Sequence, residues 1–269
     1  MGRIIECVPN FSEGRNKLVI DAIVEAIRNG GKNADCAEPG VKVLDVDPGE
    51  ATNRTVVTFA GSPEAVMEAA FEGVRKAGEL IDMRHHHGAH PRSGATDVLP
   101  LIPISGITLE ECALLARQLA ERIFRELGIA CYCYEAAAYT PERKNLAVCR
   151  SGEYEALPQK IADEKLKPDF GPAEYNDTIA RSGAINVGAR DFLIAVNFNL
   201  NTTSTALANE VAFDVRERGR AKRENCKIVK DAEGKSVMIP GTLKGCKAIG
   251  WYIDEYGIAQ VSMNITDIN

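Results

Sequence analysis

The chain has 269 residues, a net charge of −6 and a sequence pI of about 5.4. This acidic balance argues against binding to nucleic acid or to an anionic membrane surface. The chain shows no signal-peptide profile and no apolar run of membrane-spanning length, so we expect a cytoplasmic protein. Eight cysteines are scattered without zinc-site spacing, which is typical of small buried side chains in a reducing compartment.

Helix-like and strand-like stretches alternate through residue 134, as apolar spacing indicates. The expected helices are 19–27, 63–80 and 109–127, and the expected strands are 3–9, 41–47, 56–59, 98–103 and 129–134. Ser62, which precedes a proline, begins the second helix as an N-cap. We expect Gly30 and Gly31 to end the first helix, and Pro48 with Gly49 to break the strand that follows it.

Residues 135–191 differ from the chain before them. Prolines and glycines mark this segment as irregular, apart from a short helix near 153–162. We place a boundary near residue 180, with one subdomain over 1–180 and a second over 181–269.

The second subdomain contains a strand over 192–200, a helix, and a hairpin formed by strands over 248–254 and 258–265. This order opens a split β-α-β unit, which needs one more helix and strand to close. The expected fold class is therefore α+β. It comprises two α/β subdomains, each a mixed sheet covered by helices, the second ferredoxin-like and lacking its last elements.

All four histidines lie in the stretch 82–97, which glycines and a proline mark as a loop between a helix and a strand. Histidine titrates near neutrality, so the cluster has three interpretations: a proton-transfer site, a metal site, or a polar loop without chemistry. The metal site would use His86, His87 and His90. The chain lacks the HExxH and Cys-x-x-Cys signatures of strong metal sites, which favours proton transfer over metal binding.

The motif Cys7-Val8-Pro9-Asn10-Phe11-Ser12-Glu13-Gly14 resembles the opening of the glutamate formiminotransferase family, the transferase domain of formiminotransferase-cyclodeaminase. Further blocks resemble that family in the same order from end to end of the chain. They are 44–47, 52–56, 81–83, 88–92, 152–158, 168–172, 188–190 and 249–252. Residues 85–87 depart from the family's usual residues, which weakens the metal interpretation further.

The resemblance implies transfer of the formimino group from N-formimino-L-glutamate to N5 of tetrahydrofolate, giving 5-formiminotetrahydrofolate and glutamate, a late step of histidine breakdown. It implies tetrahydrofolate, with one or several glutamates, as co-substrate and no metal. It also implies a homodimer, and a separate cyclodeaminase for any second activity. Two alternatives stay open: a family member that binds folate without transferring a group, and an enzyme that uses a formyl donor.

The family's catalytic histidine falls on His90, and an aspartate held near it falls on Asp47. A neutral imidazole can take a proton from N5 and return it to the departing amine, while a carboxylate can stabilise the amidinium cation. Asp47 could instead cap the turn after its strand. Arg54, Arg92 and Arg190 lie in matched blocks and are candidate clamps for substrate carboxylates, with structural ion pairs as the alternative.

The family's folate-binding stretch begins at Gly171 and Pro172 and closes around Gly183. Tyr154 and Phe170 could stack on the pterin ring or line its pocket, with ordinary core aromatics as the alternative.

Overall fold

The computed structural model of the protein describes residues 2–267. The chain divides into two compact units, the first ending at Arg190 and the second beginning at Asp191. This division lies later than the boundary near 180 placed from the sequence. The cause is strand β7 (Ala184–Ala189), which pairs with two strands of the first unit and is buried along its whole length.

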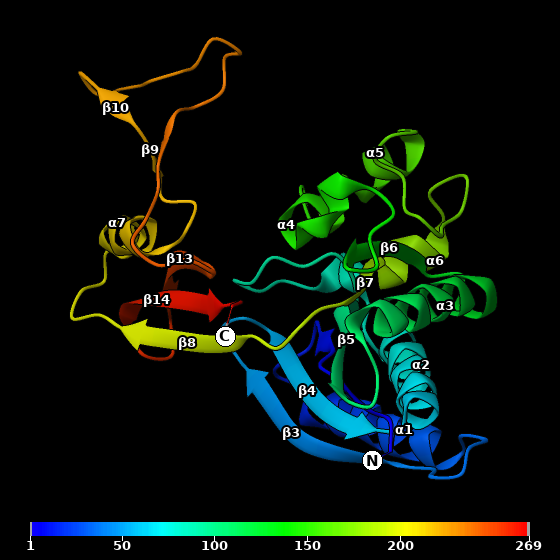
Figure 1. The fold of residues 1–269 in the computed structure, drawn as a ribbon. Coiled ribbons are helices and arrows are strands. Elements are labelled where there is room, and N and C mark those ends of the chain that lie inside the picture. The colour runs from blue at the N-terminus through cyan, green and yellow to red at the C-terminus, as the bar shows by residue number, and fades with distance from the viewer. Residues whose placement is uncertain (1, 268–269) are drawn as a thin grey trace. The chain divides into compact units, whose positions relative to one another are not determined.

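The first unit is built on a seven-stranded mixed sheet with the order β1-β4-β2-β5-β7-β6, and β3 pairs with β4 (Figure 1). The strands besides β7 are β1 (Ile4–Cys7), β2 (Asn10–Phe11), β3 (Val41–Gly49), β4 (Arg54–Gly61), β5 (Thr96–Ser105) and β6 (Ala130–Glu135). Pairings among β1 to β5 are antiparallel, whereas β7 is parallel to both β5 and β6. The expected α+β class is confirmed.

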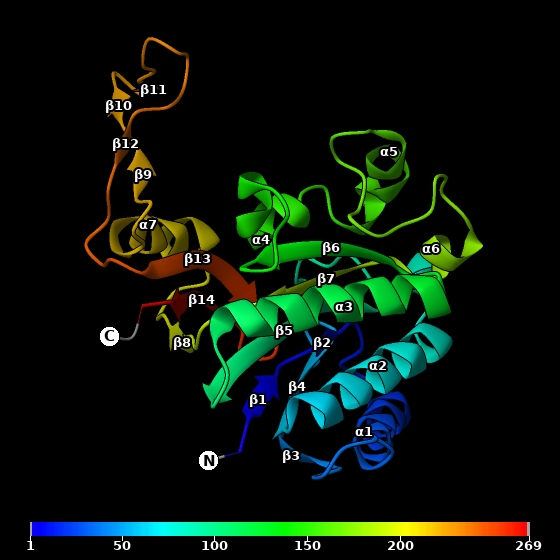
Figure 2. The same ribbon diagram turned by 45° about the vertical axis from the view of Figure 1, so that its right-hand side comes forward.

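Helices cover both faces of this sheet. The three long helices α1 (Lys17–Lys32), α2 (Pro63–Leu80) and α3 (Leu109–Leu127) lie on one face (Figure 2). Shorter elements on the other face include α4 (Leu146–Cys149), α5 (Leu157–Ala162) and α6 (Asp177–Ser182). The side chains of strand β6 point alternately to the two faces of the sheet. Cys131 and Cys133 belong to the hydrophobic core on the face of the long helices, and Tyr132 and Tyr134 belong to the core on the other face.

Local signals located the starts of α2 and α3 correctly. Ser62 caps α2, and Thr108 and Glu111 form a capping box at the start of α3. The expected end of α1 at Gly30 and Gly31 was wrong, since the helix continues to Lys32. A Cβ at Gly30 would lie 2.8 Å from the Glu68 carbonyl oxygen on α2, so this glycine permits close packing of two helices.

Two further expectations were wrong for tertiary reasons. Strand β3 continues through Pro48 to Gly49, which is possible because β3 pairs with β4 alone and an edge strand tolerates a missing N–H donor. The segment 135–191 was expected to be mostly irregular apart from one short helix. Besides that helix it contains α4, α6, β7 and two short 3-10 turns. The 3-10 turns there are Pro141–Lys144 and Tyr154–Ala156.

The second unit has the expected order of strand, helix and hairpin. Strand β8 (Ile194–Asn199) and helix α7 (Thr205–Val215) precede the hairpin of β13 (Cys246–Ile253) and β14 (Ile258–Ile265), and the sheet order is β13-β14-β8. Four short strands lie between α7 and β13: β9 (Arg220–Ala221), β10 (Arg223–Glu224), β11 (Lys227–Ile228) and β12 (Met238–Ile239). Within residues 2–267, no helix is both long enough and apolar enough to cross a membrane.

Candidate active site

The histidine stretch 82–97 is attached to the sheet of the first unit near its end. The amide of Ser12 donates to the Ala95 carbonyl at 2.8 Å, and the buried Ser12 hydroxyl donates to the Gly94 carbonyl at 2.7 Å. These bonds continue the pairing of β2 with β5. They therefore hold the end of the histidine stretch against the residues that follow β2.

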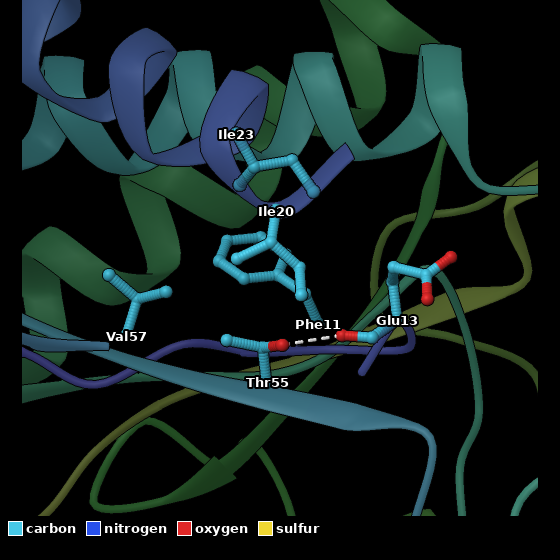
Figure 3. Close-up of a pocket in the computed structure, with 6 residues that line it drawn as sticks. All are labelled: Phe11, Glu13, Ile20, Ile23, Thr55 and Val57. Carbon is cyan, nitrogen blue, oxygen red and sulfur yellow. Dashed lines mark hydrogen bonds between the residues drawn. The ribbon is translucent and has the colours of Figure 1, made fainter. Parts of the chain in front are cut away.

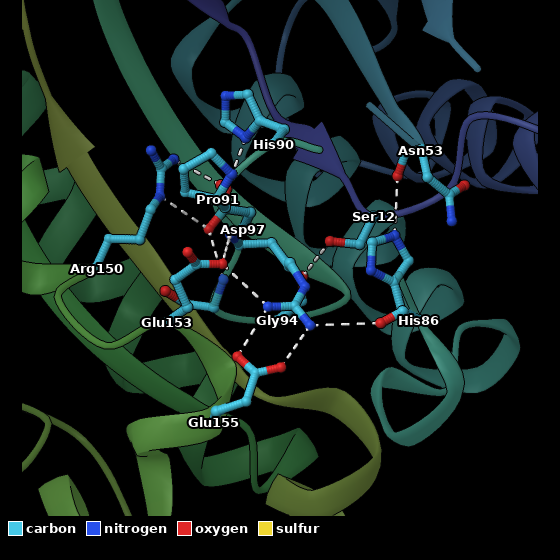
Figure 4. Close-up of polar contacts among 12 residues, drawn as sticks. Ser12, Asn53, His86, His90, Pro91, Gly94, Asp97, Arg150, Glu153 and Glu155 are labelled. Atoms are coloured by element: carbon cyan, nitrogen blue, oxygen red, sulfur yellow. Dashed lines mark hydrogen bonds and ion pairs between the residues drawn. The ribbon is translucent and has the colours of Figure 1, made fainter. Parts of the chain in front are cut away.

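His86 fastens the middle of the stretch to the turn before β4. Its ring is 7% exposed, and Nε2 lies 2.9 Å from the Asn53 carbonyl oxygen, so Nε2 must be the donor (Figure 4). The Asn53 amide in turn donates to the His87 carbonyl at 2.9 Å. Burial lowers the pKa of His86, so the ring is neutral and serves to position the loop.

His90 has one ring nitrogen fixed by the backbone and the other facing a guanidinium. Nδ1 lies 2.6 Å from the Pro91 carbonyl oxygen and must donate to it, which leaves the lone pair on Nε2 (Figure 4). That lone pair faces Nη1 of Arg54 at 2.9 Å. Burial, together with the charges of Arg54 and Arg150, lowers the pKa of His90 to about 3.

Arg54 is the first residue of β4, and its side chain joins two other elements. The same Nη1 that faces His90 donates to the side-chain oxygen of Asn10 on β2 at 2.7 Å. Burial lowers the pKa of the guanidinium, although the charges of Asp97 and Asp47 act in the opposite direction. Arg54 is therefore a largely desolvated cation in contact with Nε2 of His90.

A buried ion pair lies next to this contact. Asp97, the second residue of β5, is 1% exposed and pairs with Nη2 of Arg150 at 2.6 Å (Figure 4). The Asp97 carboxylate also accepts from the Ser93 amide at 2.9 Å. Its charge is therefore committed to Arg150 and to the loop, and the pair fixes the chain after α4 against β5.

A small apolar pocket underlies the same strands. It is lined by Phe11, Glu13, Ile20, Ile23, Thr55 and Val57, between α1 and the strands β2 and β4 (Figure 3). The Thr55 hydroxyl donates to the Glu13 carbonyl rather than into the pocket. We assign these residues to packing beneath the strands that carry Asn10 and Arg54.

Two models of known protein families match the chain, one over each unit. The formiminotransferase domain, N-terminal subdomain, matches residues 4–190, and the formiminotransferase domain matches residues 195–269. The chain belongs to the formiminotransferase family. The first matched range ends at Arg190, where the first unit ends, and the second begins at residue 195, within β8.

Curated relatives of this formiminotransferase-family chain are similar over nearly its full length. The glutamate formimidoyltransferase of Streptococcus pyogenes is 42% identical over 267 residues, which is 99% of this chain and 79% of the relative. The protein of that name from Thermoplasma acidophilum is 38% identical, with 98% of this chain and 77% of the relative covered. The formimidoyltransferase-cyclodeaminase of Sus scrofa is 46% identical over 99% of this chain, but the chain spans only 44% of that relative's length.

The structure brings some of the residues carried over from the family together. Arg54 contacts His90 directly. Asp47 lies exposed on β3, opposite Val56 of β4, and its charge acts on Arg54. These three residues form one neighbourhood at the start of β4.

Arg92 of the histidine stretch and Tyr154 of the 3-10 turn Tyr154–Ala156 form a second neighbourhood. Arg92 pairs with Glu153 at 3.0 Å and with Glu155 at 2.6 Å, which is the structural ion pair considered as its alternative role. The Tyr154 amide donates to the Arg92 carbonyl at 2.9 Å, and its hydroxyl donates to the Ala180 carbonyl. The Tyr154 ring packs against both cores of the unit.

The expected folate-binding stretch starts at the far edge of the sheet. Phe170 pairs with Cys131 of β6 through both backbone hydrogen bonds, two strand spacings or roughly 10 Å from β5. Gly171 packs against Pro168, and Pro172 is half-buried. Gly183, where the stretch closes, returns to the histidine stretch and bridges to Gly94.

Arg190 lies at a different place on the sheet. Its amide donates to the Leu101 carbonyl at 3.1 Å, and its charge lowers the pKa of Glu6 on β1, although burial raises that pKa more. Leu101 is roughly 13 Å along β5 from Asp97. Arg190 therefore does not join the contact between Arg54 and His90.

Three residues of the site were missed by sequence reasoning. Asn10 and Asp97 lie inside stretches that were singled out, but neither side chain was given a role. Arg150 precedes a matched block and carried no signal of its own. All three act through tertiary contacts with Arg54 or with each other, and such contacts leave no local pattern.

The rings of His86 and His90 make hydrogen bonds to backbone carbonyl groups. Over residues 2–267, no group of three histidine, cysteine, aspartate or glutamate side chains could hold a metal ion. His86 donates to Asn53, His90 donates to Pro91, and His87 is exposed. What the site offers chemically is a neutral imidazole lone pair next to a guanidinium.

Proposed function

We propose that this chain transfers the formimino group from N-formimino-L-glutamate to N5 of tetrahydrofolate, releasing glutamate, with His90 as the proton shuttle. The observation that carries the proposal is the 2.9 Å contact between Nε2 of His90 and Nη1 of Arg54. It joins a base of fixed tautomer to a group suited to binding carboxylates. Membership of the formiminotransferase family and the names of the relatives support the same reaction.

The reaction needs one proton removed and one delivered. N5 attacks the amidinium carbon of the donor, a bond forms between N5 and that carbon, and the N5 proton passes to Nε2 of His90. The bond between the carbon and the glutamate nitrogen then breaks, and His90 returns the proton to that nitrogen. Glutamate leaves as the amine, and the formimino group remains on N5.

The charged side chains have separate roles in this proposal. Arg54 binds a carboxylate of the donor, because a guanidinium accommodates a carboxylate through two parallel hydrogen bonds. Asp47 lies exposed near the start of β4 and stabilises the positive charge of the amidinium. Gly171 and Pro172 begin the folate-binding stretch and Gly183 closes it. Tyr154 and Phe170 stack on the pterin ring or line its pocket, and Arg92 and Arg190 bind further carboxylates of the substrates.

A transferase assay tests the proposal. Purified protein is incubated with N-formimino-L-glutamate and tetrahydrofolate, and glutamate and 5-formiminotetrahydrofolate are measured. We expect His90→Ala to lower kcat by roughly 10²- to 10⁴-fold, the range for loss of a general base. His85→Ala is the matched control, because that ring is exposed and should leave kcat within about twofold.

Other outcomes distinguish the alternatives. Folate binding without turnover by the unaltered protein would show a family member that does not transfer the group. Turnover with N-formylglutamate, and none with the formimino donor, would show a formyl transferase. Full activity of His90→Ala would remove the proton shuttle while leaving the reaction in place.

The assembly and setting of the protein complete the proposal. We expect a cytoplasmic homodimer that binds tetrahydrofolate bearing one or several glutamates. Light scattering of the purified chain measures the mass in solution. A mass equal to one chain at assay concentrations would contradict the homodimer.

A further inference from the structure

The contact that identifies the site also blocks it. A general base must present a lone pair to the proton that it removes, within hydrogen-bond distance. In the structure, the lone pair of His90 Nε2 already accepts from Nη1 of Arg54 at 2.9 Å, and Nδ1 is bound to the Pro91 carbonyl. The arrangement therefore describes a resting base rather than a working one.

The electrostatics of the resting state agree with this geometry. With a pKa of about 3, only about one His90 ring in ten thousand would be protonated at pH 7. A shuttle that must hold a proton between its removal and its delivery works best with a pKa near the operating pH. Movement of Arg54 away from Nε2 would remove one of the causes of the low pKa.

Arg54 has a reason to move when an anion arrives. Within residues 2–267 it makes no ion pair, and its hydrogen-bond partners are the neutral side chains of Asn10 and His90. The nearby carboxylate of Asp97 is occupied by Arg150 and by the Ser93 amide. A largely desolvated guanidinium without a carboxylate gains more from an incoming carboxylate than from the imidazole lone pair.

We propose that Arg54 is a carboxylate-operated latch on His90. In the free enzyme the latch occupies the Nε2 lone pair, and a carboxylate of the glutamate moiety draws the guanidinium away and releases the base. This inference rests on the proposed function, and it adds that the base becomes competent only after a glutamate carboxylate binds. Asn10 positions the latch in its resting state.

Histidine titration by NMR tests the latch without turnover. The pKa of His90 is measured with and without saturating L-glutamate, and the signal is assigned by its loss in His90→Gln. In the unaltered protein we expect a pKa near 3 that rises when glutamate binds, because the contribution of Arg54 is removed while burial and Arg150 still act. In Arg54→Gln we expect a raised pKa without ligand and no further response to glutamate.

Control variants separate the latch from a general change of charge or of fold. Arg84→Gln removes an exposed cation from the same stretch and should leave the His90 titration unchanged. Arg54→Lys keeps the positive charge but loses the two parallel N–H donors of the guanidinium. It therefore provides a second variant if Arg54→Gln does not fold. We expect Arg54→Lys to raise KM for the formimino donor more than it lowers kcat at high pH.

The outcomes distinguish this inference from the proposed reaction. An Arg54→Gln protein in which the His90 pKa stays near 3 would overturn the latch, as would an unaltered protein whose His90 does not respond to L-glutamate. If the transferase assay succeeds while His90 ignores glutamate, the reaction stands and the latch is wrong. If the assay fails while glutamate shifts His90, the latch stands as a carboxylate-sensing contact.

Discussion

At His90, burial and two guanidinium groups act in the same direction. Each disfavours the imidazolium, and the hydrogen bond to the Pro91 carbonyl opposes them only in part. At Asp97 burial raises the pKa of the carboxyl group, and the charge of Arg150, with which it pairs, acts in the opposite direction. The surroundings of His90 therefore disfavour protonation of its ring. The pairing of Asp97 with Arg150 makes removal of either partner destabilising.

The stability of the protein should therefore depend on pH through His90. A histidine whose pKa falls from 6.5 in the unfolded chain to about 3 in the folded chain binds fewer protons when folded. Its contribution is present above pH 6.5 and is lost as the pH falls from 6.5 toward 3. We expect the free energy of unfolding, measured in urea, to fall less steeply over this interval in His90→Gln than in the unaltered protein. Identical slopes would contradict the low pKa.

Breaking the buried pair should cost more than breaking an exposed one. Asp97→Asn leaves the Arg150 guanidinium without its carboxylate, and we expect a loss of about 3 kcal/mol in the free energy of unfolding. Asp21→Asn removes an exposed carboxylate from a helical pair with Lys17 and should cost under about 0.5 kcal/mol. Equal losses, measured by urea denaturation, would show that the pair with Arg150 is not buried as described.

At the scale of elements, the histidine stretch depends on how α6 joins β7. Gly183 ends α6 with a φ of 67°, and a Cβ there would lie 2.2 Å from the Ser93 carbonyl oxygen. At the same junction, the Ala184 amide donates to the Ser93 carbonyl at 2.9 Å. The family resemblance predicted that Gly183 closes a folate-binding stretch, and the structure gives it a close contact with the histidine stretch.

Gly183→Ala should therefore be more harmful than the same change at a roomy left-handed position. Gly128 has a φ of 70°, but a Cβ there would meet only Thr178 at 3.7 Å. We expect Gly128→Ala to cost about 1 kcal/mol through its backbone conformation alone. Gly183→Ala should cost roughly 3 kcal/mol or more, because the clash with backbone adds to the conformational cost. Urea midpoints measured by circular dichroism compare the two, and similar midpoints would contradict the close approach.

At the scale of the whole molecule, each unit has its own hydrophobic core. The first unit has extensive cores on both faces of its sheet, whereas the core of the second consists of Ala208, Ala212, Cys246, Ala259, Val261 and Met263. The single tryptophan, Trp251, lies on β13 of the second unit. Tryptophan fluorescence therefore reports on the second unit, while circular dichroism reports mainly on the helices of the first.

Matched valine substitutions should separate the two signals. Val261→Ala removes buried volume from the second unit and should lower the denaturation midpoint followed by Trp251 fluorescence, for a loss of about 2 kcal/mol. Val187→Ala makes the same change in β7 and should lower the midpoint followed by circular dichroism. Identical shifts of both signals by either variant would show that the units unfold as one cooperative body.

The sequence by itself determined the class of the fold, the long helices and the terminal hairpin, because helix caps and apolar periodicity are local signals. Through blocks shared with that family, it also indicated the family and predicted roles for His90 and Arg54. It did not determine that α1 passes through Gly30, that β3 passes through Pro48, or that β7 belongs to the first sheet. Each of these depends on a neighbour distant in sequence.

Only the tertiary structure decided which charges meet. Nothing local in the chain places Arg54 on the lone pair of His90, or Arg150 on Asp97, since these pairs join β4 and β5 to loops far away along the chain. Whether a charged side chain serves as a ligand, a latch or a structural ion pair depends on its distance to a partner and on its burial. Those two quantities exist only once the chain has folded.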